Sequence, residues 1–410
     1  MEKLISRLIL IILAIHLVQC ESTSNATAYS DTTSTATTTA KPTVNNYNAA
    51  ETNTAASGTS NDTTANTTSG SNATPSGPLN TVASVISNAS ASVISNITSL
   101  GGNCYKNPHK DGSCPYEDIT FWLYTRKCQN GVQIKMANFD QVLEHVDKDK
   151  PWKIVFHGFN SSKHGPGKQL KAAYLSRDSY NMLVLDYAKP MKGIVALCYI
   201  QDAIVNLNLV AKCAANFLYK MTKAGVLPDP SKLHMIGHSL GAHIAAGTSV
   251  RLSKLMNTTV DRITGLDPAG VLISTLLTKA LKRLDSKDAK FVDAHHTNNG
   301  LLAAGTWQNV GTIDIWYNYD LPTLQQNQPG CPNALLSPIK SRTCSHSRAI
   351  DYFAESINSL PTYDDKKFVG VDKKGKKQYL VGEDVSRDAN GPKGDLFVKT
   401  NSKSTFGKGE

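Results

Sequence analysis

The chain has 410 residues, a formal net charge of +10 and a 40% content of hydrophobic residues. Residues 1–20 contribute +1 and residues 21–100 contribute −3, so residues 101–410 carry +12. No nucleic-acid-binding motif accompanies this charge, and we expect no nucleic acid as a partner. A basic surface favours anionic lipid or sulfated glycan. The densest cluster, Lys373-Lys374-Gly375-Lys376-Lys377, is equally typical of a solvated turn.

The first 20 residues have the pattern of a secretory signal peptide. Lys3 and Arg7 precede an apolar run from Leu8 to Val18, which is the order of charge and apolar residues in such peptides. The run is short for a membrane span, and an uncleaved anchor is the alternative. We predict a signal peptide over residues 1–20, cleaved near Cys20-Glu21, and therefore a secreted, extracellular protein.

Residues 21–100 have a different composition. Ser and Thr supply 34 of these 80 positions, and charges are almost absent. Such a segment buries too little apolar surface to offset chain entropy, so we predict a disordered, mucin-like segment that acts as a spacer. Attachment to a glycan-rich matrix is the alternative. The segment contains N-glycosylation sequons at Asn25, Asn61, Asn66, Asn72, Asn88 and Asn96.

Residues 101–410 have the length of one large α/β domain. Seven cysteines follow the predicted signal peptide, which indicates an oxidising compartment. They are Cys104, Cys114, Cys128, Cys198, Cys213, Cys331 and Cys344. We expect Cys331 to pair with Cys344, and Cys198 to pair with Cys213, which leaves one of the first three free.

Apolar runs and helical stretches alternate along this part of the chain. Strand-like runs are Trp152 to Phe156, Met182 to Asp186, Lys232 to Ile236, Arg262 to Leu266, Phe291 to Ala294 and Ile313 to Tyr317. Helical apolar spacing covers residues 199–221. This alternation predicts an α/β fold, with a mostly parallel central sheet and helices on both faces.

The most informative motif is Gly237-His238-Ser239-Leu240-Gly241. It has the form G-x-S-x-G, lies between a predicted strand and a predicted helix, and is typical of the nucleophile elbow of an α/β-hydrolase. The two glycines allow a sharp turn, because a Cβ at either position would clash with the neighbouring strand and helix. We predict Ser239 as a nucleophile.

A serine nucleophile needs a base and an orienting carboxylate, which follow the serine in this fold in the order acid, then histidine. Asp267 follows a predicted strand and precedes Pro268. His346 lies far downstream, just past Cys344, at the start of a predicted helical stretch (Ala349 to Ile357). We predict Asp267 as the acid and His346 as the base. His295 and His296 also follow the acid and remain rivals, although their segment has the pattern of a strand.

An oxyanion formed during ester hydrolysis needs two backbone N–H donors. In this fold one donor is the residue after the nucleophile, and the other follows an early strand. The corresponding residues are Leu240 and, after Phe156-His157-Gly158, Phe159. An ordinary strand-to-loop turn is the alternative interpretation of His157-Gly158.

Taken together, these motifs resemble the pancreatic lipase family of secreted lipases over residues 112–405. The matching segments are Phe156-His157-Gly158-Phe159, Gly237-His238-Ser239-Leu240-Gly241-Ala242-His243, Ile263-Thr264-Gly265-Leu266-Asp267-Pro268-Ala269, Phe291-Val292-Asp293, His296-Thr297 and Cys344-Ser345-His346. The resemblance implies the triad Ser239, Asp267 and His346, and oxyanion donors at Phe159 and Leu240.

Compared with the family that it resembles, the chain differs in three respects. Too few residues follow His346 for a C-terminal β-sandwich, so no partner that docks on one is expected. The segment from Cys331 to Cys344 is the expected lid, and only 12 residues lie between these cysteines. The segment from His296 to Gly311 is also short. Short lids and loops in this family go with phospholipase A1 activity. Arg283, Asp285 and Asp288 match part of a calcium-binding stretch, but Ala280 replaces an expected carboxylate. We expect no metal or other cofactor.

The sequence therefore predicts a secreted enzyme that hydrolyses a lipid ester through an acyl-enzyme, at a lipid surface. Phospholipid is the first choice of substrate, and triacylglycerol is the alternative. The alternative from another functional class is a lipid-binding or matrix glycoprotein that has no catalytic activity. Two further sequons, Asn160 and Asn257, lie within this domain, and Asn160 is next to the expected oxyanion loop.

Overall fold

The computed structural model describes residues 105–191, 196–270, 282–300, 303–319, 326–358 and 367–409, and over residues 196–205 only the helix backbone. The predicted signal peptide, the Ser/Thr-rich segment with its six sequons and the expected domain boundary near residue 100 lie outside the described residues. So do Cys104 and Ala280.

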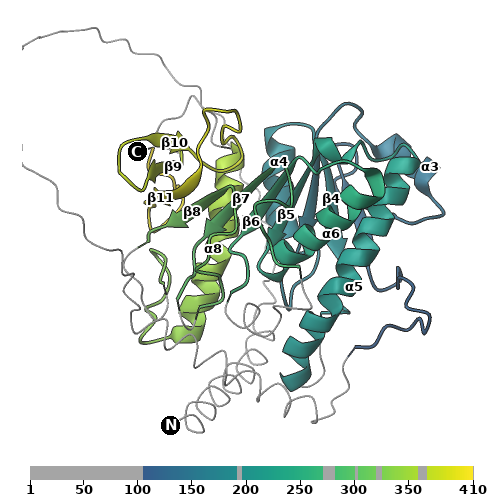
Figure 1. The fold of residues 1–410 in the computed structure, drawn as a ribbon, viewed down its shortest axis with the longest axis horizontal. Coiled ribbons are helices and arrows are strands. Elements are labelled where there is room, and N and C mark those ends of the chain that lie inside the picture. The colour runs from purple at the N-terminus through teal and green to yellow at the C-terminus, as the bar shows by residue number, and fades with distance from the viewer. Residues whose placement is uncertain are drawn as a thin grey trace, which may run out of the picture.

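The described part of the chain forms one 11-stranded sheet (Figure 1). Its strand order is β10-β9-β11-β8-β7-β6-β5-β3-β4-β1-β2, and the run from β11 to β4 is parallel. Antiparallel strands complete both edges. The bounds are β1 Thr120–Tyr124, β2 Val132–Ile134, β3 Trp152–Phe156, β4 Asn181–Asp186, β5 Leu233–His238, β6 Arg262–Leu266, β7 Phe291–His296, β8 Ile313–Tyr317, β9 Val369–Asp372, β10 Gln378–Leu380 and β11 Gly394–Val398.

Helices cover both faces of this sheet, as the sequence predicts. Alternate residues of a strand point to opposite faces, and Ile154 packs with α5 and α6 while Val155 packs with α4 and α8. The helices are α3 Phe139–Val142, α4 Pro166–Arg177, α5 Ala196–Lys223, α6 Leu240–Met256 and α8 Pro338–Asn358, with 3₁₀ turns η1 Leu143–His145 and η2 Pro230–Lys232. No helix in the described ranges has the length and apolar character that a membrane span requires.

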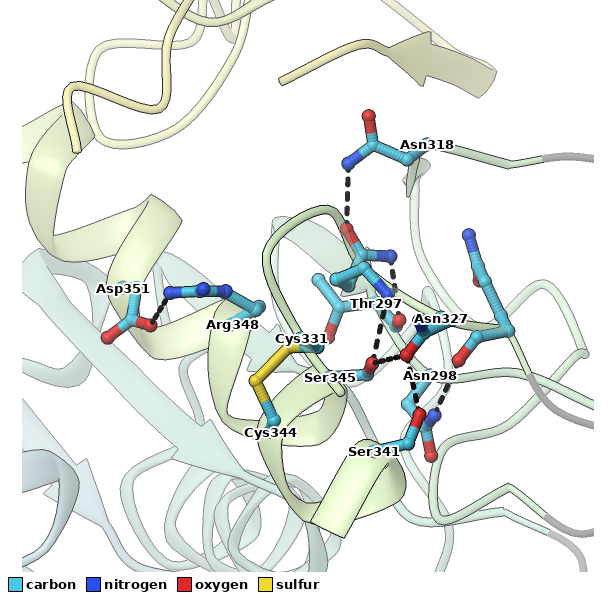
Figure 2. Close-up of a disulfide and its surroundings, with 12 residues drawn as sticks. Thr297, Asn298, Asn318, Asn327, Cys331, Ser341, Cys344, Ser345, Arg348 and Asp351 are labelled. Atoms are coloured by element: carbon cyan, nitrogen blue, oxygen red, sulfur yellow. Dashed lines mark hydrogen bonds and ion pairs between the residues drawn. A yellow bond between two sulfur atoms is a disulfide. The ribbon is translucent and has the colours of Figure 1, made fainter. Parts of the chain in front are cut away.

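Two disulfides close loops in the described residues. Cys331 and Cys344 are joined with a Cα–Cα distance of 5.7 Å, and Figure 2 shows this bridge tying the first turns of α8 to the segment before the helix. Cys213 is joined to Cys114, with a Cα–Cα distance of 5.3 Å, and fastens α5 to the segment before β1.

The expected pairing of Cys198 with Cys213 is therefore wrong. Both residues lie in α5, and 15 residues at about 1.5 Å per residue separate them by roughly 22 Å along the helix axis, far beyond the reach of a disulfide. Among the cysteines that the structure describes, Cys128 is free and half-buried.

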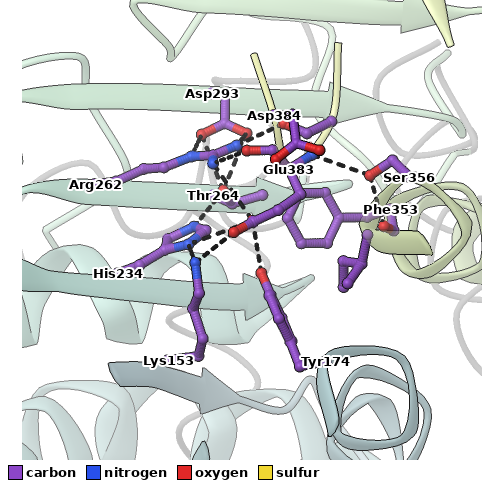
Figure 3. Close-up of polar contacts among 12 residues, drawn as sticks. Lys153, Tyr174, His234, Arg262, Thr264, Asp293, Phe353, Ser356, Glu383 and Asp384 are labelled. Atoms are coloured by element: carbon purple, nitrogen blue, oxygen red, sulfur yellow. Dashed lines mark hydrogen bonds and ion pairs between the residues drawn. The ribbon is translucent and has the colours of Figure 1, made fainter. Parts of the chain in front are cut away.

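A buried ionic network lies where the parallel strands begin. Lys153, His234 and Arg262 are in register on β3, β5 and β6, so their side chains share one face of the sheet. Lys153 donates to Glu383 at 2.5 Å, and Arg262 makes two bonds of 2.8 Å to Asp293 (Figure 3). Burial opposes ionisation of Asp293, but the Arg262 guanidinium holds the pKa of that carboxyl well below its usual value.

Glu383 links this network to the C-terminal strands. It lies between β10 and β11, and its second carboxylate oxygen accepts the Tyr174 hydroxyl at 2.6 Å. Arg262 also donates to the carbonyls of Gly382 and Glu383. Two buried cations and two buried carboxylates therefore compensate one another and anchor the β10–β11 connection against the middle of the sheet.

We predict that Glu383→Ala lowers the free energy of unfolding by about 3–5 kcal/mol, because it leaves Lys153 and Arg262 buried with one carboxylate between them. Urea denaturation measures the change. The control is Arg387→Ala, which removes a more exposed ion pair with Asp261 and should cost about 0–1 kcal/mol. Equal losses in the two variants would contradict the role given to the network.

Candidate active site

Ser239 lies on a tight turn between β5 and α6. Its backbone has φ 56° and ψ −122°, a conformation that costs a non-glycine residue about 1–3 kcal/mol and that its surroundings must hold. Its N–H donates to the Leu266 carbonyl at 3.0 Å, and its carbonyl accepts from Ala242 and Ala269. These bonds fix the turn, and the serine stands at the carboxyl end of β5.

The glycines on either side of Ser239 are required by close backbone contacts. A Cβ on Gly237 would collide with the Gly241 carbonyl and with Ala242, and a Cβ on Gly241 would collide with the carbonyls of Phe156 and His157. The strand and the helix can pack this closely only because both positions lack a side chain.

Asp267 and His346 are hydrogen-bonded to each other. Asp267 follows β6, is fully buried, and accepts from His346 Nδ1 through Oδ2 at 2.5 Å. Its other oxygen accepts the backbone N–H groups of Thr297 and Asn298 at 2.9 and 3.1 Å. An ionised carboxylate only accepts hydrogen bonds. The His346 proton therefore lies on Nδ1, and Nε2 is left as the basic nitrogen.

The register of the sheet places this pair on the same rim as Ser239. His238 is opposite Leu266 in the β5–β6 ladder, so the next residues, Ser239 and Asp267, leave neighbouring strands at the same level. Asp267 also donates its backbone N–H to the His295 carbonyl at 2.7 Å.

His346 lies on α8, two residues after Cys344. The Ser345 hydroxyl accepts the Gln328 N–H at 2.9 Å, and the Ser341 hydroxyl donates to Asn327 at 2.5 Å (Figure 2). With the disulfide, these bonds fix the helical turns that carry His346. The side chain of His346 is 14% exposed.

His238 supports His346 from the side of β5. Its Nε2 donates to the His346 carbonyl at 3.2 Å, and the two ring centroids are 4.6 Å apart. Burial, together with the nearby His346, lowers the pKa of His238 to about 3. His238 is therefore neutral, and it holds the backbone of the other histidine without placing a second charge beside it.

The side chains of the two rival histidines, His295 and His296, bond to other partners. His295 is buried between Asp293 and the Tyr317 hydroxyl, at 3.0 and 2.9 Å. His296 is buried between Asp314 and the Thr306 carbonyl, at 2.8 and 3.2 Å. Both lie within β7, and neither ring bonds to the Asp267 carboxylate, which is paired with His346.

The two expected oxyanion donors lie in the segments next to Ser239. Leu240 is the first residue of α6, where backbone N–H groups have no acceptor within the helix. Phe159 follows β3 by three residues. A Cβ on Gly158 would lie 3.0 Å from the Ser239 Cβ, so the loop that carries Phe159 passes directly against the serine.

The calcium-like stretch does not fit a calcium ion. One oxygen of Asp288 lies 2.7 Å from the Lys282 ammonium, and the other accepts the Asp285 N–H at 2.8 Å. Asp285 in turn accepts the Lys287 N–H at 2.9 Å. Burial raises the pKa of Asp288 to about 6, and Lys282 opposes that shift. Protein donors, one of them a cation, thus occupy both oxygens of Asp288 and one oxygen of Asp285, where calcium would need several free oxygen ligands.

Some residues of this site carry no recognisable sequence signal. Thr297 and Asn298 act through backbone N–H groups, which any residue could supply. His238 occupies the variable position of the G-x-S-x-G motif.

Asn160 and Asn257, the two sequons in the domain, are both exposed and adopt left-handed backbone conformations with φ 48° and 52°.

Residues 91–403 match the family model described as Lipase. The chain is 31% identical over 255 residues to a phospholipase A1 of Vespa crabro, covering 60% of this chain and 79% of that protein. It is 32% identical over 257 residues to the pancreatic triacylglycerol lipase of Sus scrofa, covering 58% of this chain and 53% of that protein. A dienelactone hydrolase structure from Anabaena variabilis is 12% identical, with coverages of 50% and 71% and a TM-score of 0.24.

We predict that neither millimolar calcium nor EDTA changes the thermal midpoint of the protein, because Lys282 already neutralises Asp288. A ligand that binds the folded state raises that midpoint, so a calcium titration followed by differential scanning fluorimetry is a direct check. A calcium-dependent rise that disappears in Asp288→Asn would contradict the assignment.

Proposed function

Because the chain belongs to the lipase family, we propose that it hydrolyses carboxylic esters of lipids through an acyl-enzyme on Ser239. The observation that carries the proposal is the bond of 2.5 Å between His346 and the buried Asp267, on the rim where Ser239 stands. A serine on a strained turn and a histidine oriented by a buried carboxylate form the pattern of nucleophilic acyl transfer.

His346 acts as the base in this mechanism. Its Nε2 takes the Ser239 proton as the serine oxygen attacks the ester carbonyl, and then returns that proton to the leaving alcohol. Asp267 keeps the ring in the required tautomer and stabilises the imidazolium. A water molecule, activated by the same histidine, then releases the fatty acid and restores Ser239.

The N–H groups of Leu240 and Phe159 hold the oxyanion of the tetrahedral intermediate. Backbone donors that are in place before the reaction stabilise the developing charge without reorganising. Gly158 supports this assignment, because its contact with Ser239 brings the Phe159 peptide to the nucleophile.

We infer that the substrate is a phospholipid, cleaved as by a phospholipase A1. The expected lid, from Cys331 to Cys344, is short. Its residues Leu335 and Leu336 are 89% and 85% exposed. An exposed apolar pair beside the site suits a lipid surface. Relatives named phospholipase A1, from Vespa crabro and from Polistes dominula, support this choice.

Triacylglycerol is the second candidate substrate, which the relationship to the pig pancreatic enzyme favours. The chain spans about half of that relative, so the activity of the whole enzyme does not transfer directly. A lipid-binding glycoprotein without catalysis is the alternative from another class, and the Asp267–His346 bond speaks against it.

Secretion completes the proposal. The bridges Cys114–Cys213 and Cys331–Cys344 are consistent with an oxidising compartment. We propose that residues 1–20 direct export, that residues 21–100 form a glycosylated spacer, and that the enzyme works outside the cell.

Replacing Ser239 with alanine should reduce turnover by several powers of ten, up to about 10⁶-fold, because the triad acts as a unit. Fatty-acid release by the purified protein measures the loss. Ser253→Ala, near the other end of α6, is the matched control and should retain activity. Substantial release by Ser239→Ala would remove Ser239 as the nucleophile.

Phosphatidylcholine vesicles should be hydrolysed faster than a triacylglycerol emulsion at equal ester concentration. The ratio of the initial rates, each corrected for Ser239→Ala, is the quantity to measure. Faster release from triacylglycerol would favour the second candidate. Release from neither lipid would favour another ester or the binding-protein alternative.

A further inference from the structure

Both ring nitrogens of His157 make hydrogen bonds to the backbone, one to the loop after β3 and the other to the loop after β4. Nδ1 lies 2.8 Å from the carbonyl oxygen of Gly158, the next residue along the chain. Nε2 lies 3.1 Å from the backbone nitrogen of Tyr187. The ring is almost fully buried and stacks on the Tyr187 ring, with 3.8 Å between centroids and 18° between planes.

These partners define the tautomer of His157. A backbone N–H can only donate, so the Tyr187 N–H requires Nε2 as an acceptor. Nδ1 therefore carries the proton and donates it to the Gly158 carbonyl. In the opposite tautomer, the buried N–H of Tyr187 would have no acceptor, and the lone pair on Nδ1 would face the Gly158 carbonyl oxygen. Both changes would raise the free energy of the folded state.

The ring remains neutral in this position. Burial lowers the pKa of His157 to about 4, and the nearby Asp186 carboxylate only partly opposes that shift. Asp186 lies 3.7 Å from Nε2, beyond hydrogen-bond range, and already accepts the Ala188 N–H at 3.2 Å. The Tyr187 hydroxyl donates to the His157 carbonyl at 2.5 Å and fixes the backbone of the same residue.

The bond to the Gly158 carbonyl has a consequence for the next peptide group. A trans peptide is planar, and its C=O and N–H point in opposite directions. The donor on His157 Nδ1 therefore determines where the N–H of Phe159 points. Because Gly158 packs against Ser239, this rotation decides whether the Phe159 N–H meets an oxyanion formed on the serine.

We propose that His157 is a positioning residue, which through its Nδ1 proton holds the Gly158–Phe159 peptide in the orientation that stabilises the oxyanion. The inference rests on the proposed ester-hydrolase function. His157 itself touches neither the substrate nor Ser239 in this assignment. Its effect is exerted on the transition state, so kcat should depend on it while KM does not.

Two substitutions separate the functions of the two ring nitrogens. The side-chain amide of Asn reaches the position of Nδ1, so His157→Asn can still donate to the Gly158 carbonyl. The amide of Gln reaches the position of Nε2, so His157→Gln can still accept from Tyr187 but leaves the Gly158 carbonyl without its donor. A purely structural role makes the two losses similar or makes Asn the worse replacement.

We expect His157→Gln to lower kcat about 10- to 100-fold with little change in KM, since removal of a whole oxyanion donor costs about 10²- to 10³-fold. His157→Asn should remain within about threefold of the wild type. Initial rates on phosphatidylcholine and thermal midpoints are measured together for both variants. Equal kcat values for the two variants, or a loss that follows KM, would overturn the proposal.

A measurement on the unmodified protein covers the case in which a variant does not fold. Nitrogen-15 NMR of histidine-labelled wild-type protein should assign His157 the Nδ1–H tautomer, with Nε2 unprotonated, at pH 6 to 8. Finding the proton on Nε2 would overturn the proposal. Absence of any Ser239-dependent ester hydrolysis by the wild type would instead remove the proposed function, and the two failures are therefore distinguishable.

Discussion

The carboxylate of Asp267 accepts hydrogen bonds from three directions while it is fully excluded from solvent. Two of the donors are consecutive backbone N–H groups after β7, and the third is a histidine that lies 79 residues away on α8. A buried carboxylate without such donors would be strongly disfavoured. The end of β7, the start of α8 and the end of β6 must therefore meet at one point, and this requirement determines where His346 lies relative to Ser239.

The two ends of the parallel strands differ in the residues that they carry. At the carboxyl ends of the strands lie the strained backbone of Ser239 and the hydrogen-bonded pair of Asp267 and His346. At the amino ends, Lys153, Arg262, Asp293 and Glu383 neutralise one another in a buried network. The ion pairs of this second rim stabilise the fold. They fasten the C-terminal strands to the sheet, so that β8 and the segment after β7 that binds Asp267 are held in place.

Part of this arrangement could be predicted from local patterns. The apolar runs at Trp152–Phe156, Arg262–Leu266 and Ile313–Tyr317 coincide with β3, β6 and β8, because strands buried on both faces are continuously apolar. The mostly parallel sheet with helices on both faces is confirmed. The glycines of the elbow were predictable for a steric reason that the backbone contacts bear out.

Other parts depend on contacts that no local pattern encodes. Cys213 pairs with Cys114 across 99 residues. The helical spacing over residues 199–221 already argues against Cys198 as its partner, but no local pattern indicates Cys114. Glu383 lies in a polar stretch with no strand signal, and its role appears only when β10 and β11 are placed beside the sheet. His157 has the appearance of an ordinary turn residue until Tyr187 is brought to its ring. The roles of Ser239, Asp267, His346, Phe159 and Leu240 in catalysis stay predictions.

Covalent trapping tests the nucleophile most directly. An alkyl phosphonate ester with a p-nitrophenyl leaving group reacts with an activated serine and leaves a stable adduct, which peptide mass spectrometry locates. We predict one adduct per chain, on Ser239, formed much more slowly in Asp267→Asn because the base is no longer oriented. An unmodified Ser239 in a protein that still hydrolyses lipid esters, or an adduct on another residue that accompanies loss of activity, would contradict it.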